Sequence, residues 1–182
     1  LLAGAAQARS ATGGVYEYLA NEVFAQQTPE VQQFLLGSAV LDEMSAVRCN
    51  ALLGLDHAAA LLELLERGNV FIVRFDKDDA HWYRYHALFQ GFLRHKLQTE
   101  AQGRAAALHR RAAEVLEAEG EWGAAFQHHM AAQEVPGAIR VALGAAKEMF
   151  EAGRLETLAQ WIDQLPADAL AQVPQLIHYR GR

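Results

Sequence analysis

The sequence is poor in cysteine, in proline and in long apolar runs, and each scarcity excludes a class of protein. Its one cysteine, Cys49, excludes an internal disulfide and is typical of a reducing compartment, so we expect a cytoplasmic protein. Four prolines and many alanines favour helices. No apolar run reaches the roughly 18 residues needed to cross a bilayer, and no signal-peptide pattern opens the sequence.

Positive charge is also scarce. The chain has 16 Lys and Arg against 22 Asp and Glu, a net charge of −6. Because binding to phosphate needs clustered basic side chains, this balance argues against a chain whose main ligand is nucleic acid. The first residue is leucine and not methionine, so we expect the chain to be a segment of a longer protein.

The sequence also lacks the usual motifs of nucleotide-binding and metal-binding sites. No Gly-x-x-x-x-Gly-Lys-Ser/Thr phosphate loop occurs, and no His-Glu-x-x-His or paired-cysteine spacing supports a metal site. His81, His86 and His95 could be grouped as metal ligands, but no known ligand spacing supports this group. His128 and His129 are adjacent, so they point to different parts of a helix surface. We therefore predict no catalytic residue, no metal and no enzyme activity for this segment.

One stretch departs from the helical pattern of the rest. Two β-rich runs, Val70–Phe75 and Trp82–Tyr85, flank a polar turn and predict a hairpin whose aromatic residues serve packing. A helical pattern begins directly afterwards and extends to Leu97. His86 lies at this change of period, where the free N–H groups and the positive dipole end of a helix are expected.

Cap signals divide the residues before the hairpin into helices. Thr28, Ser45 and Asp56 are predicted to be N-caps, and Gly54 and Gly68 are predicted to end the last two of these helices. Helices followed by a hairpin are the order of a winged-helix domain. Cys49 lies on an apolar stripe of one of them, so we interpret it as a core residue and not as a nucleophile.

The fold class that follows is mainly α: a winged-helix domain, then an all-α domain. We place a linker or the end of an upstream helical domain at residues 1–14, the winged helix at 15–100, and the helical domain at 101–182. In the last segment Gly120 and Gly153 are each predicted to end a helix, and they are 33 residues apart, close to the tetratricopeptide period of about 34 residues. Trp122 and Trp161 should pack its helix pairs together, so we expect a tetratricopeptide-like stack.

A winged helix can bind DNA, and the sequence tests that alternative. From Val15 to Glu100 there are seven Lys and Arg against twelve Asp and Glu, a balance of −5. The helix that would enter a groove, Asp56–Arg67, has one Lys or Arg, and the turn Asp76–Asp79 would repel phosphate. We therefore expect the winged helix to be a packing module.

The residues alone leave two roles open for His86. An imidazole at a helix start can donate a hydrogen bond to an anion, alongside the backbone N–H groups. It can equally be a partly buried histidine that satisfies a local hydrogen bond between strand and helix.

The stretch around His86 resembles a known family. Tyr85-His86-Ala87-Leu88-Phe89-Gln90-Gly91-Phe92-Leu93 resembles the Tyr-His-Pro-Leu-Phe-x-x-Phe-Leu stretch of MalT-like regulators, large ATP-binding LuxR-type transcription activators of the signal-transducing, STAND-type ATPase class. The resemblance spans about Val15 to Leu170. It also covers Tyr18–Val23, Pro29–Leu36, Leu64–Phe71 and His109–Ala113.

The resemblance implies a domain order. In this family a nucleotide-binding domain and a small helical domain precede the winged helix, a helical arm and tetratricopeptide-like sensor follow it, and a C-terminal helix-turn-helix binds DNA. In the wider class a histidine at the position of His86 contacts the β-phosphate of ADP. The resemblance thus implies that His86 is a nucleotide-phosphate sensor in the full-length protein, although Ala87 replaces the proline or acid usual after it.

Two functional hypotheses follow. In the first, the chain is the non-catalytic regulatory middle of an ATP-dependent activator. Its partners are then the upstream nucleotide domain, the downstream sensor repeats and an unidentified inducer, with ATP or ADP bound only in the full-length protein and DNA only by the absent helix-turn-helix. In the second, the chain is a free-standing helical-repeat adaptor for a peptide or partner helix.

Overall fold

The computed structural model describes residue 14, residues 16–100 and residues 102–180. The predicted linker at residues 1–14 lies outside the described residues except for Gly14, which is helical. The chain divides into two compact units, Leu1–Gln102 and Gly103–Arg182, called here the first and the second unit. The described residues are mainly helical with one two-stranded sheet, so the predicted fold class is confirmed.

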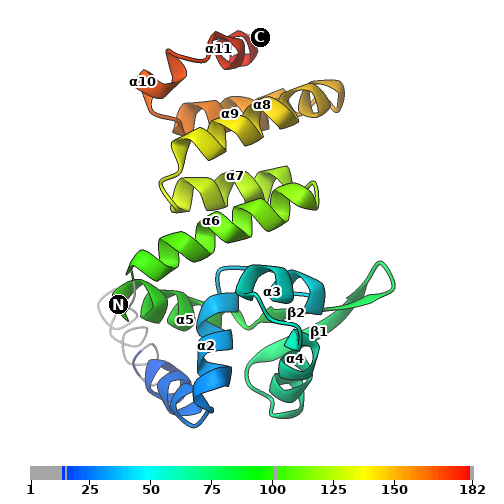
Figure 1. The fold of residues 1–182 in the computed structure, drawn as a ribbon, viewed down its shortest axis with the longest axis vertical. Coiled ribbons are helices and arrows are strands. Elements are labelled where there is room, and N and C mark those ends of the chain that lie inside the picture. Colours follow the sequence, from blue (N-terminus) through cyan, green and yellow to red (C-terminus); the bar gives the residue numbers. More distant parts are fainter. Residues whose placement is uncertain (1–13, 15, 101, 181–182) are drawn as a thin grey trace, which may run out of the picture. The chain divides into compact units, whose positions relative to one another are not determined.

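The first unit begins with a helix over residues 16–25 and continues with four helices and a hairpin. Helix α4 packs against β1, α3 packs against α4 and α2, and α5 packs against α2 (Figure 1). The bounds of these elements are α2 Pro29–Ser38, α3 Ala46–Leu53, α4 Ala58–Arg67, β1 Ile72–Lys77, β2 Ala80–Tyr85 and α5 Ala87–Glu100.

Two of the three predicted N-caps are confirmed. The side chain of Thr28 accepts a hydrogen bond from Val31 N–H at the start of α2, and Ser45 caps α3 in the same way. The cap predicted at Asp56 is wrong. The Oδ1 atom of Asn50, on α3, accepts from Ala58 N–H at 2.9 Å instead, and the N-cap position itself is His57. A cap supplied by a neighbouring helix leaves no local signal in the sequence.

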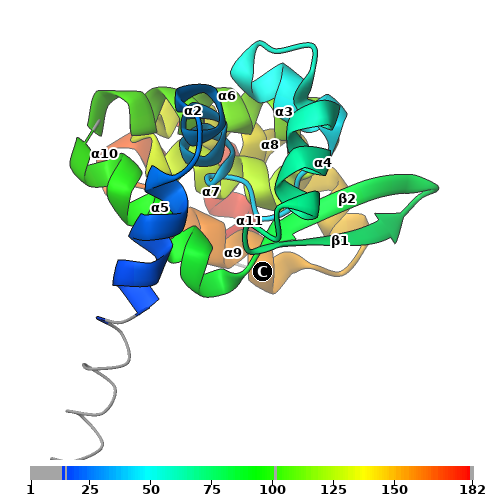
Figure 2. The same cartoon turned by 90° about the horizontal axis from the view of Figure 1, so that it is seen from below.

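The strands reach further toward the turn than predicted, and β1 begins at Ile72 and not at Val70. Strands β1 and β2 pair from Ile72 and Tyr85 up to Lys77 and Ala80, so only two residues form the turn. Asp78 and Asp79 both have positive φ, 53° and 58°, as a two-residue hairpin turn requires. Aspartate tolerates this conformation because its short side chain bonds locally. Figure 2 shows the turn projecting beyond α4.

The core of the first unit joins the hairpin to the helices. Tyr83 forms a bridge with Met44 on the side of β2 that faces away from β1. The hydroxyl of buried Tyr85 lies 2.8 Å from Ser38 Oγ on α2. Cys49 is fully buried, and this burial raises the pKa of its thiol to about 12. Both observations agree with its interpretation as a core residue and not as a nucleophile. Other fully buried large side chains are Phe34, Leu35, Leu41, Leu52, Leu62, Leu65, Phe89 and Leu93.

The second unit is helical throughout its described residues. Helices α6 to α9 form successive layers of a stack (Figure 1). Neighbours α7 and α8 pack together, as do α8 and α9, and α11 packs on α9. The bounds are α6 Gln102–Ala118, α7 Trp122–Ala131, α8 Val135–Glu151, α9 Leu155–Gln164, α10 Ala167–Leu170 and α11 Pro174–Arg180.

The same turn closes α6, α7 and α8. Gly120, Gln133 and Gly153 have φ of 76°, 57° and 71°, and the residue after each donates its N–H to the carbonyl five positions back. This is the bond pattern of a helix that ends in a left-handed residue. Glycine at two of these positions was predicted to end the helices, and it does so without a side-chain penalty.

Aromatic residues pack the helices of the second unit together, as expected. The ring of Trp161 on α9 stacks on Phe126 of α7, with centroids 4.9 Å apart. Trp122 packs against the same core and donates its Nε1–H to Glu148 on α8 at 3.0 Å. Alanine also recurs in this core, and its small side chain lets the helix backbones approach closely; the buried alanines are Ala125, Ala138, Ala142, Ala145 and Ala146.

One buried polar group lies among these helices. His129 on α7 is 3% exposed, and its Nε2 lies 2.6 Å from Glu117 Oε1 on α6. Arg140 on α8 donates to the same carboxylate at 2.8 Å. Gly137 passes so close that a Cβ there would lie 2.3 Å from His129 Nδ1. Three helices therefore meet at a single imidazole.

Candidate functional site

His86 lies between the end of the hairpin and the first turn of α5. Its N–H donates to Phe71 O at 2.7 Å, and its carbonyl accepts from Gln90 N–H at 3.0 Å. Its side chain is exposed. The joint between strand and helix is therefore made by the His86 backbone, and the imidazole is available at the surface.

The first turn of α5 offers further hydrogen-bond donors. In any α-helix the first N–H groups have no acceptor within the helix, and they lie at the positive end of its dipole. No acidic residue occupies this first turn, and Ala87 and Leu88 are exposed. An anion that approaches His86 would therefore meet a positive potential. The residues present fit contact with one phosphate group.

Aromatic rings lie around the imidazole. The centroid of the Tyr16 ring is 6.4 Å from that of His86 and 5.9 Å from that of Phe71. The Tyr16 hydroxyl is buried without a hydrogen-bond partner among the described residues, and burial raises the pKa of Tyr16. Phe71 in turn packs on Phe89 of α5, with centroids 5.2 Å apart.

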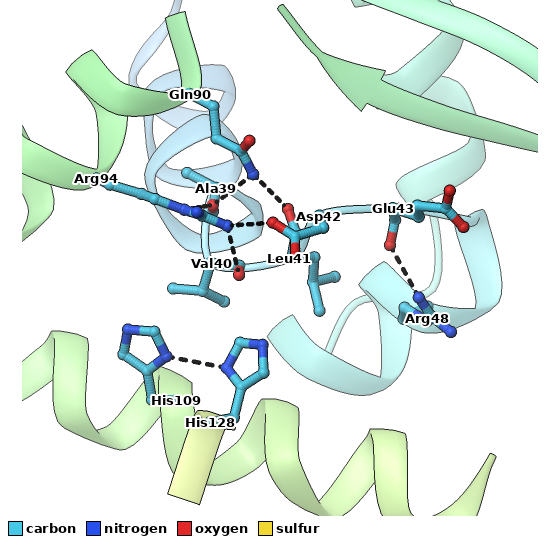
Figure 3. A network of polar contacts seen from close by, with 10 residues as sticks. All are labelled: Ala39, Val40, Leu41, Asp42, Glu43, Arg48, Gln90, Arg94, His109 and His128. Carbon is cyan, nitrogen blue, oxygen red and sulfur yellow. Dashed lines mark hydrogen bonds and ion pairs between the residues drawn. The ribbon is translucent and has the colours of Figure 1, made fainter. Parts of the chain in front are cut away.

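Two polar side chains fix α5 against the end of α2. Arg94 donates to the carbonyls of Ala39 and Val40 and pairs with Asp42 at 2.8 Å, as Figure 3 shows. One turn earlier, Gln90 donates to the carbonyls of Ala39 and Leu41 at 3.2 and 2.7 Å. A cation at the C-terminal end of α2 also interacts favourably with its dipole. This clamp was not predicted, because its only local signal in the sequence is a spacing of four between two long polar residues.

The other histidines considered as ligands do not join His86. His81 lies on β2, with its Nδ1 2.8 Å from Asp76 Oδ1, and His95 lies on α5 more than two turns after His86. In the part of the chain that the structure describes, no three His, Cys, Asp or Glu residues lie close enough to hold a metal.

His128 and His129 do point to different surroundings. His129 is buried beside Glu117, whereas His128 Nδ1 lies 2.9 Å from Nδ1 of His109 on α6 (Figure 3). In the latter pair one Nδ1 must donate and the other accept. His109 and His128 are 19 residues apart, so no local pattern in the sequence pairs them.

The hairpin has no basic residue without an acidic partner. Arg74 pairs with Glu66 on α4 at 3.3 Å, while Lys77 and Arg84 pair with Glu43 at 3.3 and 3.9 Å. These cations already have anionic neighbours within the first unit. The hairpin is therefore a poor surface for a phosphate backbone.

The comparison with protein families agrees with this geometry. Residues 20–107 match the family model of the MalT winged helix domain. This part of the chain is a MalT winged helix domain.

The match covers the hairpin, His86 and all of α5, and it extends into α6. The resemblance to MalT-like regulators is thereby confirmed, and the chain contains a region of such a regulator. A winged helix domain of this kind is not itself catalytic. Among the described residues, no helix combines the length and the apolar composition needed to cross a membrane.

Proposed function

We propose that this chain is the regulatory middle segment of an ATP-dependent, LuxR-type transcription activator. In this proposal the MalT winged helix restrains an upstream nucleotide-binding domain of the STAND type in the cytoplasm. The second unit then begins the arm and tetratricopeptide-like sensor for an inducer. Inducer and ATP together shift the regulator from a closed monomer to an oligomer.

The observation that carries this proposal is the exposed imidazole of His86 at the start of α5. A histidine kept for packing would be buried, or its ring would bond to a neighbouring strand. Here the backbone makes that joint, and the ring stands beside the free N–H groups of a helix start. In the full-length regulator His86 would donate to a phosphate of ADP held by the nucleotide domain, and so favour the resting state.

The sensor role is tested in the full-length regulator with His86→Ala. ADP should dissociate faster from the variant, and transcription without inducer should rise, because one contact made only in the resting state is lost. The matched control is His95→Ala, which removes an exposed histidine of α5, the helix that begins directly after His86. Unchanged ADP release and unchanged basal transcription in His86→Ala would remove the sensor role.

A second candidate function for the helical stack is that of a free-standing adaptor for a peptide or partner helix. The observation that favours it is the identical turn after α6, α7 and α8, because repeated units are how helical stacks build binding grooves. The two functions differ in what precedes the first unit. A phosphate loop there supports the regulator, and its absence from the full-length gene product supports the adaptor.

A further inference from the structure

Phe71 and His86 continue the register of the hairpin by one position beyond Ile72 and Tyr85. A hydrogen-bonded antiparallel pair exchanges two bonds. This pair makes one, from His86 N–H to Phe71 O. The Phe71 N–H bonds instead to Asn69 O at 2.9 Å, and the His86 carbonyl accepts from Gln90 N–H, which opens α5.

The cause is the backbone of Phe71, whose φ is 47°. Positive φ is an outlier for a bulky residue, and it turns the N–H of Phe71 back into a tight turn that begins at Asn69, where φ is also positive, 50°. Such a conformation persists only where its surroundings determine it. The Phe71 ring is held between Phe89 and Tyr16, with centroids 5.2 and 5.9 Å away.

We propose that Phe71 is a positioning residue for His86. Its left-handed backbone leaves the His86 carbonyl to α5. If Phe71 relaxed to an extended backbone, its N–H would bond to that carbonyl and the hairpin would gain a complete pair. That pairing would turn the His86 carbonyl toward β1 and away from the Gln90 N–H, so the first hydrogen bond of α5 would weaken and His86 would move from a helix start toward a strand end.

The two arrangements differ in two amides: the Phe71 N–H changes its acceptor from Asn69 O to His86 O, whereas the Gln90 N–H has its acceptor only while His86 starts α5. Hydrogen exchange of the chain distinguishes the two arrangements when two variants that both lack the aromatic ring of Phe71 are compared. Phe71→Val adds a β-branch, which opposes positive φ, whereas Phe71→Leu does not. In Phe71→Val we expect protection of Gln90 to fall roughly five- to tenfold relative to Phe71→Leu, while protection of the His86 amide is kept.

A merely structural role for Phe71 predicts something else. Both variants would then lower protection together, and amides of α2 would follow the same change as Gln90. That result, or no change at Gln90 in either variant, overturns the proposal. If Phe71→Val does not fold, Phe71→Ala and Phe71→Gly replace the pair, because only glycine accepts positive φ without strain. Gln90 should then be better protected in Phe71→Gly.

The consequence for a nucleotide rests on the proposed function and is measured separately. In the full-length regulator Phe71→Val should accelerate ADP release as His86→Ala does, and Phe71→Leu should not. If His86→Ala itself has no effect, the sensor role fails while the exchange result still decides whether Phe71 positions His86. If His86→Ala accelerates release but Phe71→Val behaves as Phe71→Leu, the positioning role fails and the sensor role stands.

Discussion

Gly137 should be a position where alanine destabilises the chain, although alanine is the better helix former. A Cβ at this position would lie 2.3, 2.4 and 2.8 Å from His129 Nδ1, Cε1 and Cγ. Ordinary contact between such atoms needs about 3.5 Å, so the imidazole must move. Because its Nε2 is fixed to Glu117 at 2.6 Å, moving the ring also strains that bond.

The magnitude follows from three terms. Overpacking of a core costs about 1–3 kcal/mol, and a weakened hydrogen bond to a charged group costs about 1.5–3 kcal/mol. Replacing glycine in a helix returns about 0.5–1 kcal/mol. We expect Gly137→Ala to lower the free energy of unfolding by about 2 kcal/mol or more. In a unit of this size each kcal/mol lowers Tm by about 4–8 °C, so the fall should be roughly 8–16 °C or more.

The assay is urea or thermal unfolding followed by tryptophan fluorescence. The chain has three tryptophans, and Trp82→Phe leaves Trp122 and Trp161, which both report on the second unit. Gly144→Ala is the matched control, since it lies on the same helix and a Cβ there has no atom within 4 Å. It should raise stability by about 0.5–1 kcal/mol.

A double-mutant cycle with His129→Ala isolates the cause. Once the imidazole is removed the clash disappears, so Gly137→Ala should then stabilise the chain by about 0.5–1 kcal/mol. The coupling energy between the two positions should therefore be about 3 kcal/mol. An equal loss of stability from Gly137→Ala with and without the imidazole would refute this reasoning, as would identical behaviour of Gly137→Ala and Gly144→Ala.

Other predictions concern charge, the clamp on α5 and ligand binding. Burial alone would raise the pKa of Glu117, but hydrogen bonds from Arg140 and the neighbouring imidazole hold that pKa below its ordinary value of 4.5. The free energy of unfolding of the wild type should therefore exceed that of Glu117→Gln most above about pH 5. This difference in free energy should shrink as the pH falls through the lowered pKa of Glu117. Arg94→Ala should cost about 1–3 kcal/mol in urea unfolding, because the Val40 carbonyl loses the donor bonded to it and the Ala39 carbonyl keeps only Gln90. Arg67→Ala removes an exposed pair and should cost about 0.5 kcal/mol or less. Calorimetry of this chain with ATP or ADP should give no binding isotherm, because the sequence has no phosphate loop. A clear isotherm would contradict this prediction. Limited proteolysis followed by mass spectrometry should cut near Gly103 before the hairpin, and early cuts within the hairpin would show that it is not packed.

The local signals of the sequence found most elements and some of their limits. Thr28 and Ser45 cap their helices as predicted, and Gly54 and Gly153 end theirs in the left-handed conformation. These features depend on a few neighbouring residues, so they can be recognised without the fold. Asp56 failed as a cap because the competing acceptor, Asn50 Oδ1, reaches Ala58 N–H from another helix.

The candidate site shows the same division. The change of period at His86 and the resemblance to MalT-like regulators singled out this residue, and the exposed ring is consistent with the role proposed for it. In the sequence Phe71 was only one residue of the β-rich run Val70–Phe75. Its positive φ and its bond to His86 depend on rings contributed by Tyr16 and Phe89, and such packing has no local pattern.

The sequence by itself determined the mainly helical class, the hairpin, the winged-helix order and the histidine at its end, because alternation, helix period and cap residues act over a few positions. Only the tertiary structure decided how that histidine is presented. A strained Phe71 gives the His86 carbonyl to α5, and Arg94 with Gln90 fixes α5 to the end of α2. Likewise, Gly137 is a packing constraint only because His129 lies against it in the folded chain. The physical reason is shared: each depends on a contact between segments whose proximity only the folded chain creates.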